Sequence, residues 1–271
     1  MPGTPDGAER PGASPSDAAL LRDACERGPL SVAHGFSPRA GGVSPAPWTS
    51  LNLGASVGDD PARVRENRRR LAEAFGVTPE RVARLDQVHG AEVVVAERGA
   101  VGRDGDALIT DDPRWLLAVS AADCLPAILC DVRRGAVAAV HAGWRGVAAG
   151  VAAAAVRALA ASFGSDPADL RAWLGPAIQG PCYQVGPEVV AAVRADPAVP
   201  EAAAWRDPGT ADRWRLDVPA AVRGQLVAAG VPPEAIAVSA TCTHCAADRC
   251  FSHRRDAGRT GRHWAVVRAP G

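Results

Sequence analysis

Several features are scarce in this 271-residue chain, and each scarcity argues against a class of protein. Lysine and arginine together number 30, and so do aspartate and glutamate. Because nucleic-acid-binding domains usually carry a basic excess, the formal net charge of zero argues against that class. Aromatic residues make up only 4% of the chain, yet 47% of the residues are hydrophobic, mostly alanine and valine, so a substantial core can form.

The chain also lacks the apolar segments that secretion and membrane insertion require. The N-terminus has no basic stretch followed by an apolar core, so we predict no signal peptide. The Ala-rich run that comes nearest to the ~18 residues of a membrane span carries Arg157 and fits a buried helix better. We therefore expect a cytoplasmic protein with no membrane partner. In a reducing compartment its seven cysteines are expected to be metal ligands, a nucleophile or core residues rather than disulfides.

The organisation of the chain is expected to be simple. Residues 1–22 are rich in Pro, Gly, Ser and Asp and are predicted to be a disordered tail. Residues 23–271 are predicted to form a single catalytic domain. Helices are predicted over 60–75, with Asp60 as the N-cap, and over 147–163, ending at Gly164. Further helices are expected over 187–195 and 218–230, and strands over 93–95, 173–178 and 235–240.

A hairpin forms the centre of the predicted structure. Two apolar runs, Leu125–Cys130 and Ala136–Val140, flank a polar turn that ends in glycine, which is the pattern of two antiparallel strands. Pairing these runs places His141 opposite Pro126. Because side chains alternate between faces with a period of two, Cys124 and His141 then lie on one face as diagonal neighbours, roughly 7–8 Å apart.

This pair allows three interpretations. A thiol and an imidazole at that separation can share a metal ion or act as nucleophile and base, or they can simply be core residues.

A Gly-containing turn with Arg145 follows the hairpin and opens onto a helix, which favours anion binding. Arg39 and Asn52 lie in a long Gly/Pro-rich loop and are candidate ligand contacts. His89 is a further imidazole at a strand edge.

A second group of possible ligands lies near the C-terminus. Cys242, Cys245, Cys250 and His253 have the spacing C-x2-C-x4-C-x2-H, and the first part of it is typical of zinc sites. The remaining spacing is compressed. A structural zinc ion, a labile disulfide or oxidation-sensitive thiols, and small packed residues all remain open for this segment.

Eight phrases then identify a family. HGFS-x-R-x-GGVS, SLNLG, ENRRRLA, QVHG, ADCLP, HAGWRG, GPAI-x6-VG and FS-x-RRD-x-G-x-TGR occur in this order over residues 30–268. The chain resembles the YfiH/YlmD "laccase domain" family, also called polyphenol oxidase or multicopper-oxidase-like proteins. The resemblance implies a mixed α/β fold, namely a single-domain α/β/β/α sandwich with mixed sheets.

The resemblance also implies a metal centre and an activity. The family binds zinc through one residue each of QVHG, ADCLP and HAGWRG, which are His89, Cys124 and His141 here. These three residues are thereby the implied catalytic and metal-ligating residues, and Cu²⁺ is an alternative occupant because it binds N/S ligands tightly. The implied reactions are phosphorolysis of adenosine, inosine and methylthioadenosine to base and sugar 1-phosphate, and deamination of adenosine. Zinc would supply hydroxide for the deamination.

The sequence indicates the substrate-binding residues less clearly than the metal ligands. Phosphorolysis requires a cationic phosphate pocket, for which Arg145 and Arg39 are candidates, and Asn52 is a candidate for the sugar or base. The family often has a glutamate where this chain has Gln184, which puts any acid–base role of that residue in doubt. The oligomeric state is not predicted.

Two other functions compete with this interpretation. A copper-dependent phenol oxidase would match the older family name, but the chain has only six histidines and multicopper oxidases need many. A Cys–His hydrolase acting on peptidoglycan precursors would use Cys124 and His141. Metal content and substrate discriminate among the three, whereas loss of Cys124 would abolish all of them.

Overall fold

The computed structural model describes residues 15–97 and 101–271, which form six α-helices and thirteen β-strands. The helices are α1 (Pro15–Ala24), α2 (Pro61–Ala74), α3 (Trp144–Ala148), α4 (Val151–Phe163), α5 (Pro187–Arg194) and α6 (Val218–Ala228). The strands are β1 (His34–Phe36), β2 (Val82–Ala83), β3 (Val93–Val95), β4 (Ala107–Thr110), β5 (Leu116–Ala121), β6 (Leu125–Asp131), β7 (Val137–Ala142), β8 (Leu170–Leu174), β9 (Gln184–Val185), β10 (Ala204–Arg206), β11 (Trp214–Leu216), β12 (Ile236–Val238) and β13 (His263–Arg268).

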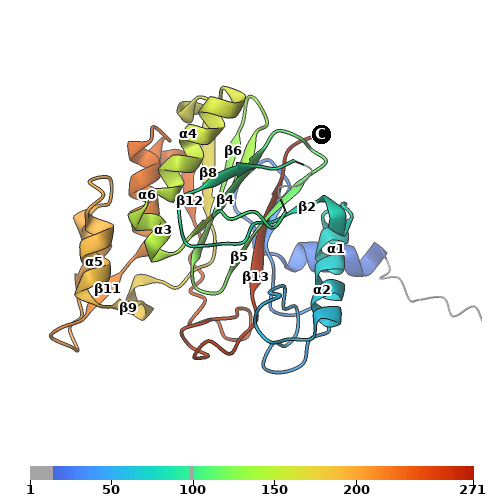
Figure 1. The fold of residues 1–271 in the computed structure, drawn as a ribbon, viewed down its shortest axis with the longest axis horizontal. Helices are drawn as coiled ribbons and strands as arrows, with labels where there is room; N and C mark the ends of the chain where they lie inside the picture. The colour runs from blue at the N-terminus through green and yellow to red at the C-terminus, as the bar shows by residue number, and fades with distance from the viewer. Residues whose placement is uncertain (1–14, 98–100) are drawn as a thin grey trace, which may run out of the picture.

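Two β-sheets lie face to face between outer helices (Figure 1). The larger sheet has the order β12-β8-β6-β7-β4-β3, and the smaller has the order β1-β13-β5-β2. Both contain parallel and antiparallel pairs, such as β12 with β8 and β6 with β7. A third, three-stranded sheet, β10-β11-β9, lies beside α5. The α/β/β/α sandwich with mixed sheets expected from the sequence is confirmed.

Three hydrophobic clusters fill the spaces between successive layers. The first packs α4 and α6 against the larger sheet, the second lies between the two sheets, and the third packs the smaller sheet against α2. The central hairpin takes part in two of them because its side chains alternate. Ala127 and Leu129 of β6 face the helices, whereas Ile128 and Cys130 face the other sheet.

The central hairpin has the predicted register. Pro126 pairs with His141 in the antiparallel ladder between β6 and β7. Helix α2 also agrees with its prediction, since the Asp60 side chain accepts a hydrogen bond from the backbone N–H of Ala62 and caps the helix. Val64 and Leu71 lie buried on its inner face.

Two predictions differ from the structure. The predicted disordered tail covered residues 1–22; residues 1–14 lie outside the described residues, but Pro15–Ala24 form α1. Leu21 of this helix is buried in the cluster around α2, and this contact offsets the entropy of ordering the segment. The predicted helix over 147–163 is divided into α3 and α4, because Gly150 adopts a left-handed conformation with φ of 75°.

Over the part of the chain that the structure describes, no helix has the length and apolar character needed to cross a bilayer.

Candidate metal centre and active site

Three side chains converge at one end of the central hairpin. Cys124 immediately precedes β6, His141 lies on β7, and His89 comes from the loop between β2 and β3. Their ligand atoms all lie within 4.8 Å of one another, and Cys124 Sγ is 3.9 Å from His89 Nε2. The two imidazole rings are 4.8 Å apart and nearly perpendicular. Two nitrogens and one sulfur in this arrangement could hold a zinc ion with a fourth position open.

The loops that carry these residues have unusual backbone conformations. His89 has a φ of 62° and Asp123, next to Cys124, has a φ of 93°. Such values are uncommon for residues other than glycine and persist only where surrounding contacts hold them. The Asp123 carboxylate accepts hydrogen bonds from the Thr243 hydroxyl at 2.7 Å and from the Arg254 N–H at 2.6 Å. The segment after β12 therefore holds the residue that precedes Cys124 in its unusual conformation.

The Asp106 carboxylate orients two of the three groups. One of its oxygens accepts a hydrogen bond from His141 Nδ1 at 2.8 Å, which leaves Nε2 directed toward the centre. The backbone N–H groups of His89 and Gly90 donate to the same carboxylate at 3.0 and 2.6 Å. Burial raises the pKa of Asp106, but these donors outweigh it, and the net shift is downward. A buried carboxylate on a ligand histidine is the usual outer support of a zinc site.

Gly143 permits the close approach of the ligands. A Cβ atom at this position would lie 2.7 Å from His89 Cδ2 and 3.2 Å from Cys124 Sγ. The first distance is well inside van der Waals contact, so only glycine lets both side chains occupy their places. The glycine of HAGWRG thus has a steric role at the centre.

The metal-free site favours a thiolate beside an imidazolium. Burial raises the pKa of Cys124, but the charge of His141 and hydrogen bonds from both histidines outweigh it and lower the pKa to about 6. Burial lowers the pKa of His141, but the adjacent thiolate and Asp106 raise it to about 9. Such a pair can be a nucleophile with its base, and the same thiolate is the form that binds a metal ion.

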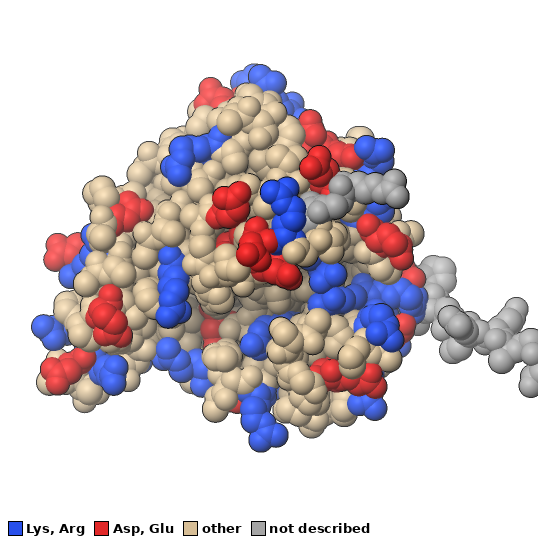
Figure 2. All heavy atoms as spheres, viewed as in Figure 1, with Lys and Arg blue, Asp and Glu red and all other residues tan. Residues whose placement is uncertain are grey.

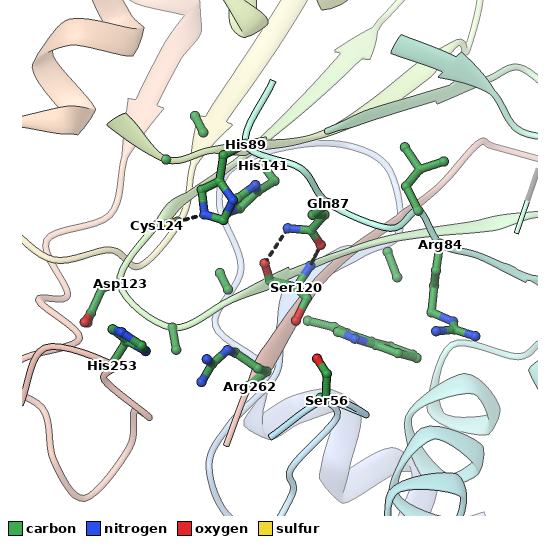
Figure 3. Close-up of a pocket in the computed structure, with 18 of the residues that line it drawn as sticks. Ser56, Arg84, Gln87, His89, Ser120, Asp123, Cys124, His141, His253 and Arg262 are labelled. Carbon is green, nitrogen blue, oxygen red and sulfur yellow. Dashed lines mark hydrogen bonds between the residues drawn. The ribbon is translucent and has the colours of Figure 1, made fainter. Parts of the chain in front are cut away.

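A cavity of about 540 Å³ opens beside the triad. Figure 2 shows one face of the molecule, with a hollow near its centre and both arginine and acidic side chains around it. The size falls within the range of about 300–1,000 Å³ that is typical of small-ligand sites. Trp144 and Tyr183 supply aromatic surface to the wall, and Gln87 lies beside Ser120, with which it exchanges two hydrogen bonds (Figure 3).

Four arginines line the cavity: Arg254, which stacks on the Tyr183 ring, and the group of Arg68, Arg84 and Arg262. In Figure 3 Arg84 and Arg262 lie on the opposite side of the cavity from His89 and His141. Arg68 and Arg84 both stack on the Trp264 ring, at 5.1 and 5.6 Å from its centroid. Among the described residues, none of the three arginines in this group forms a salt bridge within 4.0 Å. Burial lowers the pKa of Arg68 to about 10, so it remains charged at neutral pH.

The predicted substrate contacts lie elsewhere. The Arg39 guanidinium donates to the carbonyl groups of Thr49 and Ala247, and it stacks on Phe251. Asn52 is fully buried, and its amide holds the backbone of Gly54, which does line the cavity.

The Arg145 guanidinium stacks on the Trp144 ring, 4.3 Å from its centroid, and Arg145 is not part of the described cavity wall. A substrate contact by Arg39, Asn52 or Arg145 stays a prediction that the lining of the cavity does not support.

Gln184 and the C-terminal cysteines are also placed by the structure. The Gln184 amide donates to the Asp207 carboxylate at 2.6 Å and does not reach the described cavity wall. Cys250 is buried with Phe251 against the core, whereas His253 lines the cavity. The four residues Cys242, Cys245, Cys250 and His253 do not form one described ligand group. Of the interpretations left open for this segment, the four-ligand zinc site has no support from the structure, because Cys250 lies in the core and His253 faces the cavity.

Sequence reasoning missed four residues of this site. In the run Arg68–Arg70, Arg69 and Arg70 pair with glutamates, whereas Arg68 reaches the cavity. Arg68 lies in the matched phrase ENRRRLA and Arg262 in the phrase ending TGR, and this was the available signal. Asp106 could have been suspected as a carboxylate directly before a buried strand. Arg84 carried no signal.

Comparison with known proteins identifies the family of the chain. A purine nucleoside phosphorylase of Streptomyces coelicolor is 45% identical over 236 residues, which cover 85% of this chain and 93% of that protein. A purine nucleoside phosphorylase of Deinococcus radiodurans is 42% identical over 241 residues, covering 89% and 90%. The crystal structure of YlmD from Geobacillus stearothermophilus superposes with a TM-score of 0.84 at 36% identity, covering 92% of this chain and 99% of that one. The family model described as multi-copper polyphenol oxidoreductase laccase matches residues 33–269, and the chain belongs to this family of YfiH/YlmD-like proteins.

Proposed function

We propose that this protein is a zinc-dependent purine nucleoside phosphorylase that converts adenosine, inosine and methylthioadenosine, with phosphate, to free base and sugar 1-phosphate. The observation that carries the proposal is the cavity itself, whose wall includes a His-Cys-His centre and three arginines, Arg68, Arg84 and Arg262, that form no salt bridge with a carboxylate of the described residues. The names of the relatives in Streptomyces and Deinococcus support the same reaction. We further propose His89, Cys124 and His141 as the zinc ligands.

Phosphate is the anion that suits the part of the cavity wall formed by Arg68, Arg84 and Arg262, which we call the arginine wall. Arg68, Arg84 and Arg262 present positive charge to a partly enclosed space, where charge-assisted hydrogen bonds to phosphate oxygens are strong. In phosphorolysis a phosphate oxygen bonds to C1′ of the ribose while the N9–C1′ bond breaks, and the base leaves with that electron pair. Fixing phosphate on one wall therefore orients the nucleophile. Trp144 and Tyr183 offer aromatic faces for the purine.

The ligand set fits zinc in its chemistry. It combines nitrogen and sulfur donors, leaves a position open, and includes a histidine held by the Asp106 carboxylate. When bound, zinc supplies Lewis acidity and lowers the pKa of water to roughly 7, which is what deamination of adenosine requires. We therefore include adenosine deaminase activity in the proposal, with copper as an alternative occupant of the site.

A product analysis tests this function. Zinc-loaded protein is incubated with adenosine, with and without phosphate, and adenine, ribose 1-phosphate and inosine are separated. We expect adenine and ribose 1-phosphate only when phosphate is present, and inosine in both conditions. Folded, zinc-loaded protein that turns over no purine nucleoside would exclude the proposal.

A second candidate function follows from the thiolate–imidazolium pair. Cys124 and His141 without metal have the arrangement of a nucleophile and its base, which would suit a hydrolase of peptidoglycan precursors. Activity that survives chelation and is lost on alkylation of Cys124 would favour this reaction. A copper phenol oxidase has weaker support, since the metal centre contains only two of the six histidines.

A further inference from the structure

A second group of ligand atoms lies outside the cavity, where two distant segments meet. The helical turn η3 (Gly180–Cys182) contributes Cys182, and the loop after β12 contributes His244 and Cys245. Their ligand atoms all lie within 4.8 Å of one another, and the sulfur atoms of Cys182 and Cys245 are 3.4 Å apart. Cys242 begins the same turn as His244 and Cys245, but it is not one of the three residues whose ligand atoms lie within 4.8 Å of one another.

We propose that the cluster of Cys182, His244 and Cys245 binds a second zinc ion, with the thiolate of the neighbouring Cys242 completing the site as the fourth ligand. Four protein ligands would close the coordination sphere, as in structural zinc sites. In a tetrahedral site with Zn–S bonds of about 2.3 Å, two sulfur atoms are about 3.8 Å apart. The separation of 3.4 Å between Cys182 and Cys245 is near this value and far from the bonded S–S distance of about 2.05 Å.

The backbone is already arranged around the cluster. Ala177 forms a parallel bridge with Cys242, and the Thr243 N–H donates to the Ala177 carbonyl at 3.1 Å. The Gln179 N–H points at Cys242 Sγ at 3.5 Å. Backbone N–H groups directed at the first sulfur of a C-x2-C turn favour the thiolate that a metal ion needs.

The site would stabilise one wall of the active cavity. Tyr183, next to Cys182, lines the cavity, and Thr243, next to Cys242, holds the Asp123 carboxylate beside Cys124. A metal ion that joins the two segments would therefore keep Asp123 and Tyr183 in place without touching the substrate. This role is independent of the reaction that the cavity performs.

The first test is the zinc content of purified variants. We expect two zinc ions per wild-type chain, one in Cys124→Ser and one in Cys245→Ser. His244→Ala is expected to weaken the second ion, whereas Cys250→Ala, the matched control, keeps both because Cys250 lies in the core. With cobalt in place of zinc, Cys124→Ser should keep a thiolate-to-cobalt charge-transfer band that disappears when Cys245→Ser is added. One zinc ion in the wild type together with none in Cys124→Ser overturns the proposal.

The second test needs no variant, so misfolding cannot affect it. Wild-type protein is alkylated before and after zinc removal by a chelator, and the modified cysteines are identified by mass spectrometry. We expect Cys182, Cys242 and Cys245 to be protected in the zinc-loaded protein and modified after removal. Equal modification of these three in both states, or a disulfide between Cys182 and Cys245 in protein isolated under reducing conditions, overturns the proposal.

Discussion

Asp106 accepts a hydrogen bond from Nδ1 of His141 at 2.8 Å, and both side chains are almost completely buried. This contact fixes the orientation of the imidazole. The same carboxylate holds the loop of His89 through two backbone N–H groups. Asp106 is not one of the three candidate ligands, yet it positions two of them, so we expect the metal affinity of the proposed centre to depend on it.

Replacing Asp106 should weaken the metal centre. The change Asp106→Asn keeps the size of the side chain but removes the charge that orients His141, and loss of such support typically costs 10–100-fold in metal affinity. Zinc affinity is measured by competition with a chromophoric chelator. Asp131→Asn is the matched control, since Asp131 is also buried on this hairpin but caps the turn at its other end. Wild-type affinity in Asp106→Asn would contradict the proposed role.

A methyl group at Gly143 should disrupt the same centre by steric contact. The backbone angles at Gly143, φ of −76° and ψ of 168°, are accessible to alanine, so Gly143→Ala should fold. Its Cβ would lie 2.7 Å from His89 Cδ2 and force that ring away. We expect loss of zinc from the centre with an unchanged circular dichroism spectrum. Gly90→Ala is the control, because the nearest atom to its Cβ is 3.6 Å away.

The arginine wall gives a kinetic prediction on helix α2. Arg68 lines the cavity, whereas Arg69, the next residue, pairs with Glu66 and Glu73 on the outer surface. A hydrogen bond to a charged group contributes about 1.5–3 kcal/mol, so Arg68→Gln should raise the KM for phosphate by roughly 10–100-fold. Arg69→Gln should leave that KM within about twofold, because exposed ion pairs contribute little to stability.

If Arg68→Gln and Arg69→Gln change the KM for phosphate to the same extent, the proposal that Arg68 binds phosphate is contradicted. A rise in the KM for nucleoside with that for phosphate unchanged would instead place the purine against Arg68. The measurement is therefore made as a two-substrate kinetic analysis, with each substrate varied at several fixed levels of the other.

Some parts of the structure could be predicted from the sequence and others could not, for physical reasons. The hairpin and its register follow from alternation, because burial of one face determines which residues pair, and so Cys124 and His141 could be placed together. The third candidate ligand, His89, comes from a loop whose conformation depends on Asp106, and no local pattern reports such a contact. It was identified only through the family resemblance.

The three arginines of the arginine wall show more clearly what local sequence cannot predict. Arg68, Arg84 and Arg262 come from a helix, the residue after β2 and the loop before β13, so only the packing of three layers brings them to one wall. The predicted phosphate contact, Arg145, was inferred from a helix N-terminus, but α3 extends only from Trp144 to Ala148. The local sequence suggested an anion site at the start of α3, whereas the tertiary structure gathers cavity-lining arginines from other elements.

His263 gives the protein a pH-dependent stability that is separate from the metal centre. Its imidazole is fully buried, and Nε2 accepts a hydrogen bond from the Phe251 N–H at 2.6 Å, so the ring must be neutral in the folded state. Burial lowers its pKa to about 3, and the nearby positive charges of Arg39, Arg255 and Arg262 contribute. The unfolded chain binds a proton at this residue below pH ~6.5, whereas the folded chain does not, so stability is lost as the pH falls below that value.

The expected contribution of His263 is about 1.4 kcal/mol of unfolding free energy lost between pH 7.5 and 5.5. Urea unfolding of metal-free protein at both pH values measures it, and His263→Gln provides the comparison because its amide oxygen can still accept the Phe251 N–H. Other groups titrate equally in both proteins, so their contributions cancel in the difference. The variant should be less stable than the wild type at pH 7.5, and the gap should narrow by about 1.4 kcal/mol at pH 5.5. A gap that stays constant over this range would mean that His263 is protonated to the same extent in the folded and unfolded chains, contrary to its burial and its hydrogen bond.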